Sequence, residues 1–134
     1  DFYKLTDEYV KIIKKEMIDN LESVIEMRRE NVALYDELID YNDNVSNYFF
    51  NNNAVPWRKN VFIKEEVREH YIKELLNTNV PVSDWYPVSS IMLDDYNDYK
   101  NAEKMGRTIV NFPLMISKSE IYRICNALNA IKEK

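Results

Sequence analysis

The strongest constraint on the fold is a long amphipathic pattern that starts near the N-terminus. Apolar residues recur at steps of three and four from Tyr9 to Ile39, which is the spacing of one face of an α-helix. Unbroken from Asp7 to Asp40, this helix would be about 51 Å long, whereas a compact domain of this size has a radius of gyration of about 14 Å. The helix must therefore bend, near Asn20 or Arg28-Arg29, or extend from the domain as a bridge. We favour the bridge.

The rest of the chain alternates β-prone runs with helical patterns, after an asparagine-rich loop at 42–53. Prolines within two of the β-prone runs favour edge positions in a sheet. The predicted strands are Val55–Ile63, Val80–Tyr86 and Thr108–Phe112, and the predicted helices are Lys64–Leu76, a segment from Asp94 or Asp95 to Met105, and a segment from Ser117 onward.

These elements predict an α+β (α/β-like) fold. We expect a long N-terminal helix, then a small, roughly three-stranded sheet covered on one side by helices, in the order α-β-α-β-α-β-α. The sequence has no internal repeat and no Gly/Ser linker. We therefore expect a single domain over 1–134, with a connecting helix at 1–45 and a small α/β domain at 46–134.

The last predicted helix has a complete start signal. Ser117 and Glu120 have the S-x-x-E spacing of a capping box, in which the serine hydroxyl accepts a hydrogen bond from the Glu120 amide while the carboxylate reaches back. Ile116 and Ile121 occupy the two positions of a hydrophobic staple. One apolar stripe then follows at helical spacing: Ile121, Ile124, Cys125, Leu128 and Ile131.

Composition excludes several classes of protein. A formal net charge of −5 argues against nucleic-acid binding, which needs a concentrated basic face. We find no run that could span a bilayer and no signal peptide. A single cysteine cannot form an internal disulfide, so we expect a cytoplasmic location. The first residue is Asp1, so we expect the chain to be processed or cut from something larger.

Self-contained cofactor chemistry is not expected. Phosphate cradles need glycines, and the only glycine, Gly106, lies at a predicted helix end. His70 is the only histidine, so neither a histidine metal cluster nor a Ser-His-Asp relay with a second imidazole can form. Cys125 falls on the apolar stripe of the last helix, where a free cysteine usually acts as a small hydrophobe.

Two acidic clusters are candidate metal sites. Asp40, Asn42 and Asn44 have the spacing of a calcium loop, but the loop lacks the glycine turn and the final glutamate. The cluster at 94–98 can hold Mg²⁺ weakly, although Asp94 or Asp95 is more simply a helix cap. We expect no metal site.

Several segments resemble one enzyme family. RRENVALYDEL at 28–38 resembles the "RR…a..Y…L" helix of the DegT/DnrJ/StrS-type sugar aminotransferases. The segments at 60–63, 64–76 and 80–87 are similar to the part of the family's small domain that comes after that helix. The segments at 101–103, 109–113 and 117 onward are similar to the family's C-terminal ending. The resemblance covers about residues 25–132, and the order and spacing of these short motifs carry it.

The resemblance implies the C-terminal small domain of a fold-type I enzyme that uses pyridoxal phosphate (PLP) to aminate a keto-sugar nucleotide. The family's PLP-binding lysine lies in the large domain, and no segment here matches it, so we assign no catalytic and no cofactor-binding residue. PLP is implied for the full-length enzyme, not for this chain alone, which we expect to be inactive. The alternative is a stand-alone, non-catalytic interaction or dimerisation module derived from that domain.

The resemblance also directs attention to a tyrosine-proline turn. Tyr86-Pro87 is followed by Val88-Ser89-Ser90, where the family often has a histidine facing the substrate. We assign Tyr86, Ser89, Ser90 and Arg58 as substrate-facing residues. The expected partner is the missing large PLP domain or a second copy bound through the N-terminal helix, with self-association through residues 9–39.

Overall fold

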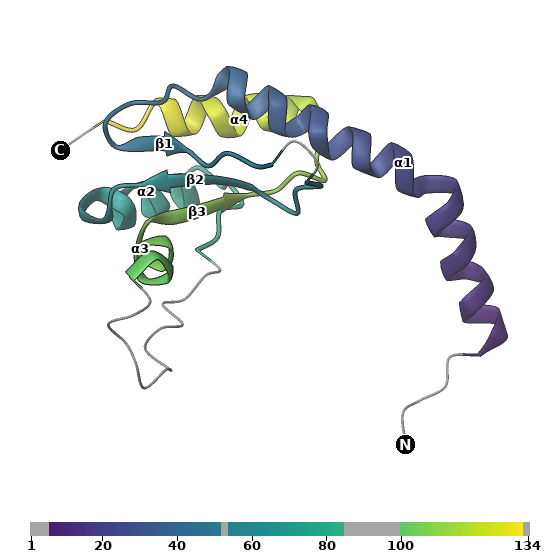
Figure 1. The fold of residues 1–134 in the computed structure, drawn as a ribbon. Coiled ribbons are helices and arrows are strands. Elements are labelled where there is room, and N and C mark those ends of the chain that lie inside the picture. Colours follow the sequence, from purple (N-terminus) through teal and green to yellow (C-terminus); the bar gives the residue numbers. More distant parts are fainter. Residues whose placement is uncertain (1–5, 52–53, 85–99, 133–134) are drawn as a thin grey trace.

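The structure is a computed structural model that describes residues 6–51, 54–84 and 100–132. Figure 1 shows its arrangement, with the N-terminal helix reaching well beyond the rest. The elements are α1 (Asp7–Leu38), β1 (Val45–Asn47), β2 (Lys59–Ile63), α2 (Glu65–Asn77), α3 (Lys100–Thr108), β3 (Ile109–Phe112) and α4 (Lys118–Asn129).

The α+β class, the long first helix and the three-stranded sheet are confirmed, but the position of one strand differs from the prediction. The first strand is β1, inside the asparagine-rich loop, so the order is α-β-β-α-α-β-α. The side chain of Asn42 accepts hydrogen bonds from the amides of Asn44 and Val45, and this turn starts the strand. Within residues 80–84, the predicted strand at 80–86 is wrong, because only an isolated bridge from Ser83 to Asn111 forms there.

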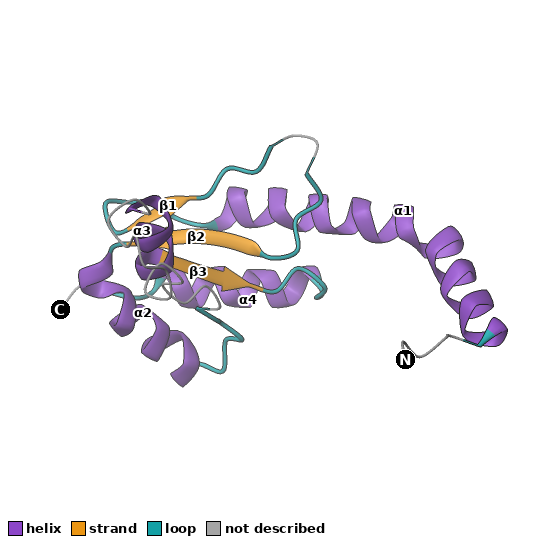
Figure 2. Ribbon diagram, turned by 60° about the horizontal axis from the view of Figure 1, so that its bottom comes forward, coloured by secondary structure: helices purple, strands orange, loops and turns teal. Residues whose placement is uncertain are grey.

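The sheet is antiparallel, in the order β1-β2-β3. Side chains alternate between its two faces. The register places Val45 opposite Ile63 and Lys59 opposite Phe112, and these residues belong to the face that we call the core face. Asn60 and Asn111 are also opposite each other, and they belong to the other face, which we call the polar face. Figure 2 shows α3 on the polar side of the strands.

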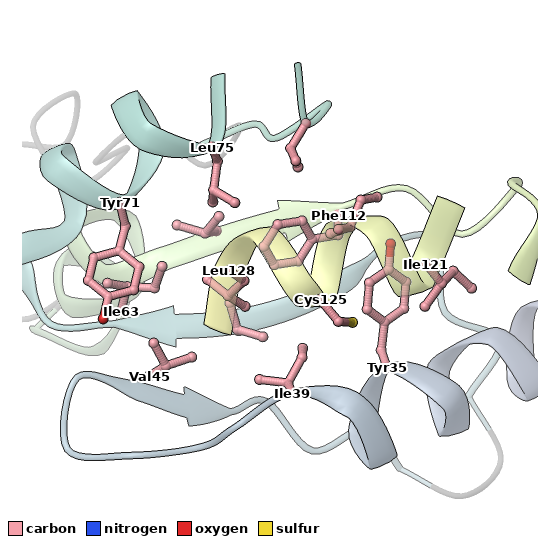
Figure 3. Close-up of a cluster of buried hydrophobic side chains, with 14 of the residues drawn as sticks. Tyr35, Ile39, Val45, Ile63, Tyr71, Leu75, Phe112, Ile121, Cys125 and Leu128 are labelled. Atoms are coloured by element: carbon pink, nitrogen blue, oxygen red, sulfur yellow. The ribbon is translucent and has the colours of Figure 1, made fainter. Parts of the chain in front are cut away.

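Three helices pack against the core face. Figure 3 shows side chains from the C-terminal part of α1, from α2 and from α4 converging on β1, β2 and β3. The Tyr35 and Phe112 rings stack with their centroids 5.9 Å apart. Asn31 on α1 donates from Nδ2 to the Leu114 carbonyl at 2.8 Å, and this bond fixes the helix against the loop before α4.

The predicted serine cap and hydrophobic staple of α4 are confirmed, but the predicted bond from the Glu120 carboxylate back to the cap is replaced by a bond to Arg123. Ser117 is the N-cap, and its hydroxyl accepts from the Glu120 amide at 3.3 Å. The Glu120 carboxylate accepts from Arg123 at 2.8 Å. Ile121 is buried in the core and Ile116 packs against it, as expected for a hydrophobic staple.

The first helix is continuous from Asp7 to Leu38 and bends near its middle, as Figure 1 shows. Its C-terminal half packs on the core, whereas its N-terminal half lies beyond the sheet, as Figure 1 shows in purple. Thr6 caps it through a hydrogen bond from the Tyr9 amide. No helix in the described ranges is long and apolar enough to cross a membrane.

Candidate functional site

A pair of buried asparagines occupies the polar face of the sheet. Asn60 on β2 and Asn111 on β3 are register partners, so their side chains lie side by side. Asn60 is 8% exposed and Asn111 is 1% exposed. Their backbone neighbours Val61 and Val110 point into the core on the other side, so the alternation of the strands forces both amides onto this face.

Ser83 extends this polar row beyond the edge of β3. Its amide donates to the Asn111 carbonyl at 3.2 Å, and its carbonyl accepts from the Asn111 amide at 2.8 Å. The Asn111 side chain also donates from Nδ2 to the Ser83 carbonyl at 3.0 Å. Residue 83 is thereby held next to the sheet in the position of a short additional strand.

Three buried oxygens in this row have no hydrogen-bond partner among the residues that the structure describes. They are Asn60 Oδ1, Asn111 Oδ1 and Ser83 Oγ. Burying a polar group without a partner costs roughly 1–3 kcal/mol, and native proteins pair nearly all such groups. Three adjacent unpaired acceptors therefore mark a place where a donor from outside the described residues belongs. We call Asn60, Ser83 and Asn111 the polar row.

A charged residue lies near the polar row, and a depression that the row does not line lies elsewhere on the same face of the sheet. Arg68 on α2 donates to the Ile109 carbonyl at 3.1 and 3.2 Å and lies 3.7 Å from the Asp84 carboxylate. A depression of about 600 Å³ lies between β1, β2 and α3, with Phe62 and Lys104 in its lining. Phe62 is two residues from Asn60 on β2, so this depression opens on the same face of the sheet.

The described side chains of the polar row can bind but not transfer protons. Amide oxygens and a hydroxyl accept hydrogen bonds from hydroxyl or amino groups. None of the three groups titrates near neutral pH. The chemistry that this arrangement supports is recognition of an uncharged or cationic donor-rich ligand.

A second polar cluster surrounds the buried side chain of Lys59 on the core face, and its members are bonded to one another. Lys59 has a completely buried side chain and forms an ion pair with Asp36 of α1. Its ammonium also donates to Asn47 Oδ1 at 2.7 Å. Asp36 Oδ1 accepts further bonds from the Tyr41 hydroxyl at 2.8 Å and from Asn47 Nδ2 at 2.9 Å. This cluster ties α1, β1 and β2 together.

Burial shifts the pKa values of several side chains in this part of the core. Desolvation lowers the pKa of Lys59, and the neighbouring Asp36 carboxylate opposes that shift. Desolvation raises the pKa of Tyr41, with a further increase from its hydrogen bond to Asp36. Burial also raises the pKa of Cys125 to about 12. The Cys125 thiol is therefore a core hydrophobe rather than a nucleophile, as the sequence predicted.

The structure describes only one of the four predicted substrate-facing residues. Arg58 is half-buried and directly precedes β2, while Tyr86, Ser89 and Ser90 lie outside the described residues, as do Asp94 and Asp95. The polar row was not predicted. A partial signal was present, because Asn60 and Asn111 are asparagines within two predicted strands, where asparagine is uncommon.

The candidate metal ligands of the sequence have other contacts. No group of three or more histidine, cysteine or acidic residues that could hold a metal occurs in the described ranges. Asn42 of the calcium-like loop uses its side chain to form the turn before β1. His70 lies on α2, where its ring nitrogens are 3.4 Å from the Lys132 carbonyl and 4.0 Å from Glu74.

Comparison with known proteins shows which solved structures share the fold of this chain. No protein-family model and no curated protein sequence matches the chain. The aminotransferase TlmJ from Streptoalloteichus hindustanus superposes with a TM-score of 0.66 and 17% identity, covering 84% of this chain and 33% of TlmJ. The sugar aminotransferase CalS13 from Micromonospora echinospora superposes with a TM-score of 0.60 and 14% identity, covering 84% of this chain and 32% of CalS13.

The chain therefore has the fold of one part of these aminotransferases. It spans about a third of the length of both solved chains. At these identities the likeness concerns the fold, so activity and substrate are matters for proposal.

Proposed function

We propose that this chain is the C-terminal small domain of a PLP-dependent aminotransferase of the DegT/DnrJ/StrS type, acting on a keto-sugar nucleotide in the cytoplasm. The observation that carries the proposal is the superposition of 84% of the chain on a third of two aminotransferases. The motifs at 28–38 and 109–120 agree with it, because they fall on α1 and on the β3–α4 segment. The larger remainder of such an enzyme would precede α1.

The described residues do not fit a PLP site of their own. The one fully buried lysine among them, Lys59, already has its ammonium bound to Asp36 and Asn47, so it is not available to hold a cofactor. Gly106, the chain's only glycine, is buried within α3 and cradles no anion. PLP would therefore be held by the part of the polypeptide outside this chain, where it supplies the electron sink for amino transfer.

The small domain would contribute substrate recognition through the polar row. A sugar presents several hydroxyl donors, and the row presents three unpaired acceptors. Tyr86, Ser89 and Ser90 come three to seven residues after Ser83 in the sequence. With Arg58 they remain our proposed substrate-facing residues.

The proposal is tested with the polypeptide encoded by the whole gene. We expect that longer protein to bind PLP and to transfer an amino group to a keto-sugar nucleotide, as detected by chromatography of the amino-sugar product. The 134-residue chain alone should form no PLP adduct that borohydride can trap. A coding region with a start codon near Asp1 and no PLP lysine upstream would overturn the proposal.

A pair of variants of the longer enzyme tests the polar row. Asn60→Leu removes an unpaired acceptor and should lower kcat/KM for the sugar substrate about tenfold, the loss of one hydrogen bond of roughly 1.4 kcal/mol. Asn126→Leu makes the same substitution at an exposed asparagine of α4 and should leave kcat/KM unchanged. Equal kcat/KM values in both variants would contradict the assignment.

The alternative function is a non-catalytic dimerisation module. The exposed apolar side chains along the first half of α1 favour it, Met17 and Ile18 among them. Sequencing upstream of Asp1 separates this alternative from the aminotransferase proposal.

A further inference from the structure

The polar face of the sheet carries a depression that the proposed function does not use. It lies between β1, β2 and one side of α3 and has a volume of about 600 Å³, which is within the range of small-molecule sites. Figure 2 shows α3 beside the strands on this side of the sheet. We call it the α3 depression, and its lining includes Ser46, Phe62, Lys64, Asn101, Lys104 and Met105.

The apolar part of this lining comes from two elements. Phe62 on β2 and Met105 on α3 are both half-buried and both line the depression. The Phe62 ring packs against the Tyr48 ring, with the two centroids 5.5 Å apart. On α3, Asn101, Met105 and Thr108 follow at steps of four and three, so one side of the helix faces the strands. A planar ring suits these walls, because phenyl and thioether groups both make favourable contacts with aromatic rings.

Two lysines at the rim add positive charge. Lys64 and Lys104 are exposed and line the depression, and among the residues that the structure describes neither ammonium forms an ion pair. The only carboxylate in the described lining belongs to Asp43. The lining is therefore net positive, although the chain as a whole has a formal net charge of −5. Local positive charge in a concave surface attracts anions.

Arg107 explains why these two lysines lack partners. Glu65 follows Lys64 in the sequence, and Glu103 precedes Lys104. Both carboxylates are bound instead to the Arg107 guanidinium, at 2.7 Å and 3.0 Å. This three-residue cluster ties α3 to the start of α2 and engages the acidic neighbours of the lysines. Both ammonium groups are thereby left available for a ligand.

We propose that the α3 depression binds a small planar aromatic ligand that carries a carboxylate or a phosphate. The ring would lie against Phe62 and Met105, and the anionic group would lie between Lys64 and Lys104. The Ser46 hydroxyl, which lines the same space, can donate a hydrogen bond to a ligand or accept one from it. An apolar wall with a few polar groups at its rim is typical of sites that orient a small molecule.

This proposal does not depend on the aminotransferase proposal. The polar row does not line the α3 depression, and the test has no enzymatic readout. A protein that binds the ligand but transfers no amino group would contradict only the aminotransferase proposal. A protein that transfers the amino group but does not bind the ligand would contradict only this one.

Methyl NMR of the full chain tests the site. Benzoate added to protein with labelled methionine methyl groups should shift the Met105 resonance until the site is saturated. Met17 and Met115 are internal controls, because they are 57% and 54% exposed and do not line the depression. Their resonances should stay in place. Equal shifts at all three methionines would indicate general adsorption to apolar surface and would overturn the proposal.

Probes of similar size separate the ring from the charge. Benzoate and phenyl phosphate should both shift the Met105 resonance, and the one that binds more tightly identifies the anion. Benzyl alcohol keeps the ring and cyclohexanecarboxylate keeps the charge, so each should bind about tenfold more weakly than benzoate. Equal affinity for either of these two would overturn the ligand class. No shift of Met105 with benzoate or phenyl phosphate would overturn the site.

A matched pair of charge reversals tests the cationic rim. Lys104→Glu should lower the affinity for benzoate about tenfold, because a carboxylate at the rim repels the anion. Lys118→Glu makes the same change of net charge on α4, which packs on the core face of the sheet, and screening by salt should keep its effect below about twofold. Both lysines are exposed, so both variants should fold. Equal losses of affinity would show that overall charge governs binding and would overturn the proposal.

Discussion

The two faces of the sheet both bury polar side chains, but they treat them differently. On the core face, Lys59 is buried and its ammonium is bound to both Asp36 and Asn47. On the polar face, Asn60 and Asn111 are buried with their amide oxygens unpaired among the described residues. Strand alternation places these opposite situations one residue apart, at positions 59 and 60.

This difference in pairing distinguishes polar groups that hold the fold together from polar groups that are available for binding. A paired buried charge holds elements together and would be costly to break. An unpaired buried acceptor contributes nothing to the stability of the isolated domain and costs desolvation. This desolvation cost is offset only if a donor from outside the described residues forms a hydrogen bond with the acceptor. The core face is thus architectural, and the polar face has the properties of a binding surface.

The largest expected effect is on the core face. Asp36→Ala removes a partly exposed carboxylate from a fully buried ammonium and should destabilise the domain by roughly 1.5–3 kcal/mol, measured by urea unfolding at pH 7. Glu37→Ala is the control, because Glu37 is exposed on the same turn of α1, and it should change the free energy of unfolding by less than about 0.5 kcal/mol. Similar values for both variants would show that Lys59 is solvated rather than held.

A second effect on the core face depends on pH. The unfolded chain loses the Cys125 proton near its ordinary pKa of about 9, whereas the folded chain keeps it until its pKa of about 12. Over that window the folded state binds more protons, so stability falls as pH rises, by up to about 1.4 kcal/mol per pH unit. The lowered pKa of Lys59 acts in the opposite direction, because there the unfolded state binds the extra proton.

Comparison with a variant isolates the Cys125 contribution. Cys125→Ala should make the decline in unfolding free energy between about pH 9 and 11 shallower than in the unaltered chain. Asn126→Ala, at an exposed neighbouring position on α4, should leave the slope unchanged. An unchanged slope in Cys125→Ala would mean that the thiol titrates in the folded state at its ordinary pKa.

Much of the fold could be predicted because local signals were unambiguous. The 3.6-residue period of α1 and the Ser117–Glu120 box located their helices nearly to the residue. Asn79, just after α2, takes the left-handed conformation common at helix ends, with φ of 56°. The first strand was missed because it is only three residues long and its start depends on side-chain bonds from Asn42, which a search for β-prone runs does not detect.

The candidate site was harder to predict, because it depends on register. Asn60 and Asn111 are distant in sequence, and only the pairing of β2 with β3 places them side by side. Ser83 joins them through a single bridge rather than a strand. The unpaired state of their oxygens is a property of packing, and no pattern of residue types encodes it.

The smallest expected effect is on the polar face, and it gives the clearest contrast. Asn60→Leu replaces a buried amide whose oxygen has no partner among the described residues, and it should leave the free energy of unfolding within about 1 kcal/mol of the unaltered chain, or raise it. Asn31→Leu makes the same substitution at a buried asparagine whose Nδ2 is bound to the Leu114 and Ile116 carbonyls, and it should cost roughly 1–3 kcal/mol, since two acceptors lose their donor. Urea unfolding of the two variants under one condition compares them directly. If Asn60→Leu lowered the free energy of unfolding as much as Asn31→Leu, the Asn60 amide would have a structural role. The polar face would then be as structural as the core face, and the assignment of binding to it would fail.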